Sequence, residues 1–288
     1  MRWGDFRQSS NVEDRTGISG GGGGMRLGLG GIVIAIIASL VFGINPLEFL
    51  GMMQGSGPVA PAPEPPTRSQ PGPGPQTGAP PASPQKQLVA GVLGDTEDVW
   101  TSVFRAMGKQ YVPPQLVLFS GATETRGCGG ASASVGPFYC PADRKLYLDT
   151  SFFNQLARMG GAGDFAQAYV IAHEVGHHVQ NLLGTMSQFD AQSRRMGERD
   201  RNALSVRLEL QADCYAGVWG AYAQKRNILE PGDLEEGMRA AAAVGDDQIT
   251  RGRVAPERFT HGTSGQRQQW FKRGLDSGDP RSCDTFGG

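Results

Sequence analysis

The chain has 288 residues, a formal net charge of −1 and 19% charged residues. This balance lacks the strongly basic surface on which nucleic-acid binding depends, so we expect no nucleic-acid partner. Of the 19 prolines, 11 lie between Pro58 and Pro84, and the roughly 200 residues beyond them are enough for one domain with a hydrophobic core.

The first predicted element is an apolar segment near the amino terminus. Residues 27–47 contain no charged side chain and would span roughly 30 Å as a helix, which matches the hydrocarbon core of a bilayer. Four arginines precede this segment: Arg2, Arg7, Arg15 and Arg26. Because positive charge favours the cytoplasmic side, we predict a short cytoplasmic segment over residues 1–26 and a single transmembrane helix over residues 27–50.

A cleaved signal peptide is the alternative interpretation of this apolar segment. The polar stretch before it is long, however, and no clear cleavage site of small residues follows it. We therefore favour an uncleaved anchor in the inner (cytoplasmic) membrane, with the rest of the chain on the periplasmic or extracellular side.

The next segment, residues 51–87, is rich in proline, glycine and alanine. This composition predicts a disordered linker. Partly extended, the linker would hold a domain over residues 88–288 on the order of 60–100 Å from the membrane.

The first half of that domain combines helices with a small sheet. A helix is expected over residues 96–108, and a short buried strand over residues 116–119. Residues 138–140 and 145–148 have the composition of two hairpin arms around a turn. A further helix is expected over residues 151–159.

A helix that begins at Asp164 and stops at Gly184 contains the most informative motif. His173 and His177 are four residues apart, so both imidazoles lie on one face and reach one ion at about 2.0–2.1 Å. Glu174 flanks that face, where it would take a proton from metal-bound water. The same five-residue pattern also occurs in helices that bind no metal, so a zinc site needs further support.

A second motif, on a helix expected over residues 202–225, supplies that support. Glu209 would be the third protein ligand, and the fourth position would stay open, as in catalytic zinc sites. Asp213, one turn later, would accept a hydrogen bond from a ligating imidazole. A layout with a third histidine six residues after His177 fails, because that position is Leu183.

The two remaining histidines have separate interpretations. His178 points away from the ligand face of its helix, so we expect no metal-binding role. His261 lies in a loop beside glycine, from which it would stabilise the oxyanion of a tetrahedral intermediate. A surface or helix-capping role is the alternative. Asp246 and Asp247 either mark a helix terminus or support the metal site, and we favour the helix terminus.

The carboxyl-terminal half completes a predominantly helical pattern. Helices are expected over residues 231–244 and 266–274, with a loop over most of residues 251–263. The order of elements predicts an α+β fold that is mainly helical, a zincin-like metalloprotease domain with a small sheet.

All four cysteines lie in the predicted outer domain, at Cys128, Cys140, Cys214 and Cys283. An oxidising compartment favours two disulfides. Three pairings are possible, but the short loop between Cys128 and Cys140 suggests a local bridge, which leaves Cys214 with Cys283. Loop-closure entropy predicts contributions of roughly 3 and 4 kcal/mol. Buried free thiols are the alternative.

Several motifs are spread over the chain: residues 1–3, 11–14, 136–141, 173–180, 209–217 and 259–264, with Gln266, Arg267, Trp270 and Phe271. Together they resemble the bacterial neutral zinc metallopeptidase family over essentially the whole chain. The resemblance implies a membrane-anchored zinc peptidase. It implies His173, His177 and Glu209 as ligands and Glu174 as base.

The sequence therefore predicts a zinc-dependent peptidase with one zinc ion and a peptide or protein substrate. Glu174 would deprotonate the zinc-bound water and then protonate the leaving amine. The alternative is a non-catalytic module in which zinc stabilises a fold that binds envelope partners, although such a site would not need Glu174. Hydrolysis of a non-protein amide, such as a cell-wall crosslink, would use the same motifs.

Overall fold

The computed structural model describes residues 1–17 and 83–287. The predicted transmembrane helix, and the predicted linker up to residue 82, lie outside these described residues. Within the described part of the chain, no helix is both long and apolar enough to cross a lipid bilayer. The described elements are mainly helices with a small sheet, so the expected α+β class is confirmed at this level.

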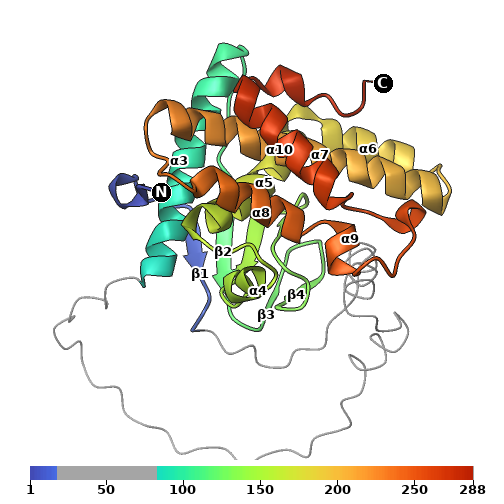
Figure 1. Ribbon diagram of the computed structural model, residues 1–288, viewed down its shortest axis with the longest axis horizontal. Helices are drawn as coiled ribbons and strands as arrows, with labels where there is room; N and C mark the ends of the chain where they lie inside the picture. Colours follow the sequence, from blue (N-terminus) through green and yellow to red (C-terminus); the bar gives the residue numbers. More distant parts are fainter. Residues whose placement is uncertain (18–82, 288) are drawn as a thin grey trace, which may run out of the picture.

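The main sheet has four strands (Figure 1). Their order is β1 (Val12–Asp14), β2 (Gln115–Phe119), β6 (Lys145–Asp149) and β5 (Phe138–Cys140). β1, β2 and β6 are parallel. β5 is antiparallel to β6, and these two strands form the hairpin that the sequence predicts.

Strand β2 is buried on both faces because it lies between two apolar layers. Leu116 and Leu118 belong to the main core, which the helices cover. Val117 and Phe119 point to the opposite side and pack with Tyr147 of β6 in a second, smaller cluster. That side is covered by a separate antiparallel pair, β3 (Ala122–Glu124) and β4 (Gly130–Ser132). A strand buried on both faces has a continuous apolar run rather than an alternating one.

The described helices are α3 (Pro84–Ala106), α4 (Phe152–Arg158), α5 (Asp164–Leu183), α6 (Thr185–Ser193), α7 (Glu198–Lys225), α8 (Asp233–Ala243), α9 (Asp246–Ile249) and α10 (Ser264–Ser277), with 3₁₀ turns η1 (Trp3–Asp5), η2 (Pro256–Arg258) and η3 (Pro280–Cys283). Helices α5, α7, α8 and α10 gather above the sheet in the view of Figure 1, whereas α3 extends down beside β1 and α4 is drawn at the level of the strands. Helix α5 packs against α3, α7 and α8, and α10 packs along α7.

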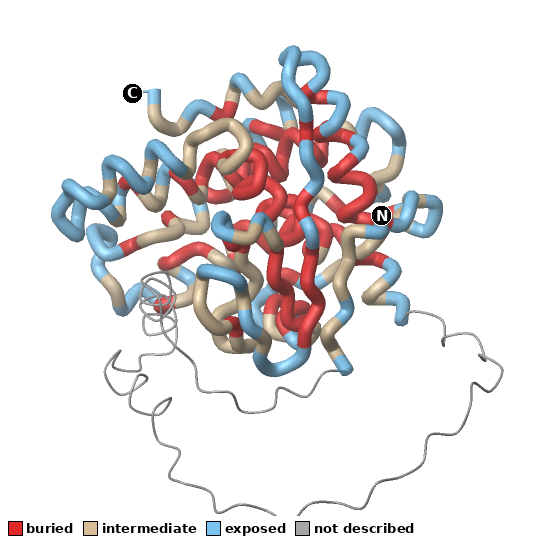
Figure 2. Tube along the Cα trace, turned by 180° about the vertical axis from the view of Figure 1, so that it is seen from behind, coloured by how far each residue is buried: buried red, intermediate tan, exposed pale blue. Residues whose placement is uncertain are grey.

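Helix α5 is the centre of the core. Of its 20 residues, 15 are buried, so packing surrounds it on nearly all sides. Phe165 at its start stacks on Trp219 of α7 with ring centroids 5.8 Å apart, and Tyr169 meets Phe271 of α10 edge to face at 5.1 Å. Figure 2 shows the buried trace concentrated in the middle of the molecule. The polar side chains of α5 therefore lie in a desolvated environment.

The first 17 residues belong to the folded domain, because β1 pairs with β2. The buried carboxylate of Glu97 in α3 accepts three hydrogen bonds from this segment, donated by Arg7, Ser9 and Asn11. Residues 1–17 are thus part of the folded domain and not a separate segment, whereas the compartment predicted for residues 1–26 stays a prediction. A strand of only three residues is too short to show an alternation of apolar and polar side chains in the sequence.

The second described stretch also begins before the predicted boundary at residue 88. Helix α3 starts at Pro84, and the side chain of Ser83 accepts a hydrogen bond from the backbone N–H of Lys86 at 3.3 Å. Proline in the first turn after a serine cap is a common helix start. The helix predicted over residues 96–108 is thus the carboxyl-terminal part of a longer helix.

Candidate metal centre

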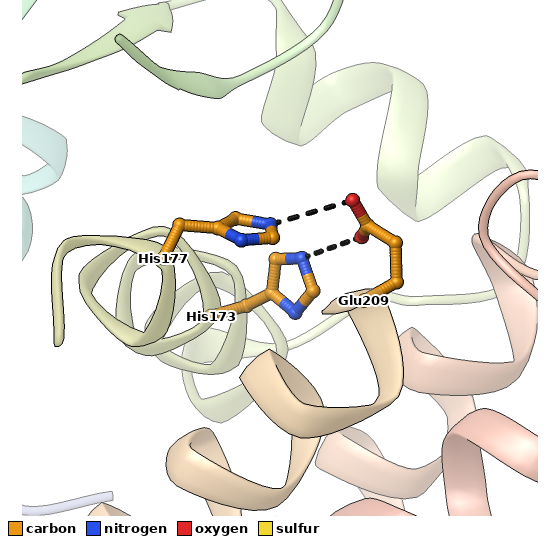
Figure 3. Close-up of side chains that lie close together, drawn as sticks. All are labelled: His173, His177 and Glu209. Atoms are coloured by element: carbon orange, nitrogen blue, oxygen red, sulfur yellow. Dashed lines mark hydrogen bonds and ion pairs between the residues drawn. The ribbon is translucent and has the colours of Figure 1, made fainter. Parts of the chain in front are cut away.

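Three side chains from two helices converge on one point (Figure 3). His173 and His177 come from successive turns of α5, and Glu209 comes from α7. The Nε2 atom of His173 lies 3.2 Å from Oε2 of Glu209, and Nε2 of His177 lies 3.5 Å from Oε1. The candidate ligand atoms all lie within 4.8 Å of one another. The structure thus brings together the three residues that the sequence proposes as ligands.

The spacing of these atoms fits a zinc ion. Ligands at about 2.0–2.1 Å from a tetrahedral Zn²⁺ lie about 3.3–3.4 Å from one another. The two N···O distances of 3.2 and 3.5 Å, each to a different oxygen of Glu209, bracket this value. Burial opposes the charge of Glu209, but the neighbouring imidazoles of His177 and His173 hold its pKa well below the usual range. The carboxylate is therefore in the form that binds a metal.

Gly176 allows the two helices that carry these ligands to approach closely. A Cβ at this position would lie 2.9 Å from the backbone oxygen of Ala212 and 3.1 Å from its Cα. Real side chains essentially never approach that closely, and the backbone of α7 would have to move. The glycine inside the histidine motif therefore helps to place Glu209 opposite the two imidazoles.

Glu174 lies beside the two imidazoles and is 8% exposed. Its Oε2 atom is buried and has no hydrogen-bond partner among the residues that the structure describes. Burial raises the pKa of this carboxyl above its usual range, although His173 and His177 oppose the shift. A buried carboxylate oxygen without a protein partner is costly, so its position is explained best by a water or ligand that it contacts.

Asp213 orients His173 from behind. The Nδ1 atom of His173 lies 2.9 Å from Oδ1 of Asp213, which also accepts a short hydrogen bond from the hydroxyl of Tyr169. Arg267 of α10 donates to both carboxylate oxygens at 2.8 Å. Burial disfavours the imidazolium, but Asp213 and Glu209 outweigh it and raise the pKa of His173 to about 9.

Two further polar residues of α5, Gln180 and His178, are buried and hydrogen-bonded, but only Gln180 contacts a candidate ligand. Gln180 is fully buried, and its Oε1 lies 2.9 Å from Nδ1 of His177. His178 points away from the site, as expected, and its ring contacts the hydroxyl of Tyr139 and the carbonyl of Val112. Burial lowers the pKa of His178 to about 4, so this ring is neutral and structural.

His261 is held near Glu209 by the carboxylate of Asp246. Oδ1 of Asp246 lies 3.2 Å from Nδ1 of His261, and Oδ2 accepts backbone hydrogen bonds from Thr260, His261 and Gly262 at 2.7–3.0 Å. Burial opposes a positive ring, but Asp246 and then Glu209 raise the pKa of His261. Gly262, with φ of 91°, permits the turn that wraps around this carboxylate.

Asp246 begins α9, as the helix-terminus interpretation expects, but its side chain also supports the loop that carries His261. The roles of Arg267 and Gln180 were not predicted from the sequence, and for Asp246 the sequence favoured a helix terminus over a supporting role at the site. Arg267 was present in the family motif, and Gln180 follows the second histidine by three residues on a buried helix. Each is a buried polar side chain, which needs hydrogen-bond partners inside the protein.

Both predicted disulfides are confirmed. Cys128 is bonded to Cys140 and Cys214 to Cys283, and the described part of the chain holds no free cysteine. The second bond joins η3 to α7 next to Asp213, so the carboxyl-terminal end is fixed against the helix that carries Glu209.

Comparison with known proteins agrees with the geometry of the centre. The family described as "Putative neutral zinc metallopeptidase" matches residues 1–286. A protein of Escherichia coli K12 with the name "Uncharacterized protein YpfJ" is 48% identical over 297 residues, covering 100% of this chain and 99% of its own. "Uncharacterized protein Mb2605" of Mycobacterium bovis is 48% identical over 200 residues, covering 64% of this chain and 66% of its own. No solved structure matches. The chain belongs to the family described as "Putative neutral zinc metallopeptidase".

Proposed function

We propose that this protein is a peptidase that hydrolyses peptide bonds with one zinc ion held by His173, His177 and Glu209. One observation supports this proposal above the others. Two imidazoles and a carboxylate converge at zinc-like spacing, while the buried Oε2 of Glu174 beside them lacks a partner among the described residues. Three protein ligands and a free carboxylate are typical of a hydrolytic zinc site.

The chain's own residues divide the reaction between them. Bound Zn²⁺ supplies Lewis acidity and makes water acidic near neutral pH. Glu174 takes the proton of the attacking water and then donates it to the leaving nitrogen. His261, whose Nδ1 faces Asp246, stabilises the negative oxygen of the tetrahedral intermediate. The raised pKa of His261 favours the ring with two N–H donors, which suits this role.

A non-catalytic zinc module and hydrolysis of a non-protein amide are the other candidate functions. A purely structural zinc site fills all four ligand positions and has no use for an unpartnered buried carboxylate. Glu174 therefore favours the enzyme. The motifs are the same for hydrolysis of peptides and of other amides. Both kinds of substrate must therefore be tested.

We also propose that the domain works outside the cytoplasm, at the inner membrane. Two disulfides support this location, because disulfides persist in oxidising compartments. The apolar residues 27–47 support association with the membrane. Residues 1–17 would share the domain's compartment, since β1 is part of its sheet.

The deciding experiment compares zinc-loaded wild type with Glu174→Gln. Both are offered unfolded proteins, envelope peptides and cell-wall amides, and bound zinc is measured in the same samples. We expect Glu174→Gln to keep its zinc and to lose two or more orders of magnitude in turnover, because the attacking water loses its proton acceptor. The control is Glu198→Gln, an exposed glutamate at the start of α7. Equal turnover, or equal rescue of a deletion phenotype, by wild type and Glu174→Gln would favour the zinc module.

A further inference from the structure

Gln180 occupies a position that neither the motif nor the family description assigns a role. Its side chain is fully buried, one turn after His177 on α5. The Oε1 atom of Gln180 lies 2.9 Å from Nδ1 of His177. The other nitrogen of the same ring, Nε2, faces Glu209 at 3.5 Å. Gln180 therefore contacts the nitrogen of His177 that the ligand cluster does not use.

The orientation of the Gln180 amide is determined by its other partners. The Nε2 atom of Gln180 lies 2.6 Å from the backbone carbonyl of Leu208. A carbonyl only accepts hydrogen bonds, so this atom must be the amide NH₂. The second proton of this group points to Oε1 of Gln211 at 3.1 Å. The atom that faces His177 is therefore the amide oxygen, which only accepts.

The amide of Gln211 is oriented in the same way. Its Nε2 donates to the backbone carbonyl of Cys283 at 2.9 Å. Its Oε1 is thus free to accept from Gln180. The backbone carbonyls of Leu208 and Cys283 each accept a hydrogen bond from one of the two amides. They therefore determine which atom of each amide is the donor. The Cys214–Cys283 disulfide holds the second of these carbonyls beside α7.

We propose that Gln180 is a positioning residue for His177, and that it keeps the proton of this imidazole on Nδ1. The lone pair of the neutral ring then lies on Nε2, the nitrogen that faces Glu209. The role rests on the proposed metal site, because a fixed tautomer matters only if Nε2 binds an ion. Gln180 does this without charge, whereas His173 is oriented by the ionised pair of Asp213 and Arg267.

The test uses the full-length protein with Gln180→Met and Gln180→Glu. Methionine has a similar length but no acceptor for Nδ1–H, whereas the protonated carboxyl of a buried glutamate keeps an acceptor oxygen for Nδ1–H and an O–H donor for the carbonyl of Leu208. Nitrogen-resolved NMR of labelled histidine should show a slowly exchanging Nδ1–H of His177 in the wild type and in Gln180→Glu. This signal should be lost in Gln180→Met. A general packing defect would not distinguish the two variants in this way.

Zinc affinity, measured by competition with a chromophoric chelator, is the second readout. We expect Gln180→Met to bind zinc about 10–100-fold more weakly and Gln180→Glu to recover most of the loss. The control is Gln188→Met on the exposed face of α6. If Gln180→Met is too unstable to purify, Gln211→Met, which leaves Gln180 in place but removes its partner, should show a smaller loss.

The outcomes separate this inference from the proposed function. Wild-type affinity in Gln180→Met, or a wild-type His177 without a proton on Nδ1, overturns the role of Gln180. A wild type that shows the protected Nδ1–H but binds no zinc overturns the metal site instead. Loss of the NMR signal and of affinity in Gln180→Met, with recovery in Gln180→Glu, supports both.

Discussion

Arg267 and Asp213 form a buried, two-point ion pair behind the candidate metal centre. Nε of Arg267 donates to Oδ2 and Nη2 donates to Oδ1, both at 2.8 Å. Neither side chain is more than 3% exposed. The pair links α10 to α7, and Asp213 in turn contacts His173, so a structural ion pair and a candidate ligand share one carboxylate.

Asp213→Asn should therefore damage stability and metal binding together. The amide leaves the guanidinium of Arg267 buried without its counter-ion, which costs about 3–5 kcal/mol in the free energy of unfolding. Zinc affinity should fall about 10–100-fold, because His173 loses a charged partner. Urea denaturation and zinc competition measure the two effects. Asp276→Asn, which breaks an exposed pair with Lys272, should change stability by less than about 1 kcal/mol. If Asp213→Asn and Asp276→Asn lose the same stability and the same zinc affinity, Asp213 does not couple the ion pair to metal binding.

Glu209→Ala should remove most of the bound zinc, because two histidines alone hold the ion weakly. The measurement is zinc content after dialysis, with Glu198→Ala of the same helix as the control. Asp246 is a poor substitute ligand, since its carboxylate already accepts three backbone hydrogen bonds and faces His261. Stoichiometric zinc at full affinity in Glu209→Ala would mean that a different acidic residue binds the ion.

Gly176→Ala should force α5 and α7 apart. The new methyl group would meet the backbone of Ala212 at 2.9 Å, and overpacking of this kind costs about 1–3 kcal/mol. We expect a lower melting temperature and weaker zinc binding. Gly265→Ala is the matched control, because a Cβ there meets nothing within 4 Å and alanine favours a helix. If both variants melt alike, the close approach does not hold the ligands together.

Acidic pH should weaken the interactions of Glu13 in β1 with Arg15 and Lys145. Hydrogen bonds from Arg15 and Lys145 lower the pKa of Glu13 from 4.5 to about 2. A carboxyl whose pKa is lower in the folded state stabilises the fold above pH 4.5, and this contribution is lost as the pH falls toward 2. The difference in unfolding free energy between wild type and Glu13→Gln should thus be largest above pH 4.5 and shrink steadily below it. Denaturant titrations from pH 7 to pH 3 measure this difference, and a gap that is independent of pH would contradict it.

The parts of the site that follow from local patterns could be predicted from the sequence. His173 and His177 share a face because helical periodicity requires it, and α5 ends at Leu183, just before Gly184, as expected. Glu209 and Asp213 lie on a helix for the same reason. The two disulfides were predicted from an expected oxidising compartment and from the short loop between Cys128 and Cys140.

The contacts that depend on tertiary packing could not be predicted in this way. Nothing local indicates that the carboxylate of Asp246 supports a loop 14 to 16 residues later, or that Gln180 meets Gln211 from another helix. Helix α6 was also missed, because none of its residues is buried and its apolar pattern is weak. Such contacts become visible only when the elements are packed.

The pairing of β1 with β2 joins the two described stretches of the chain in one sheet. Val12 lies opposite Leu116, and Asp14 opposite Leu118, in one continuous sheet. The two strands cannot pair across a bilayer, so residues 1–17 and 83–287 lie in the same aqueous compartment. The sheet is therefore complete only after the amino terminus has reached the compartment of the candidate metal centre.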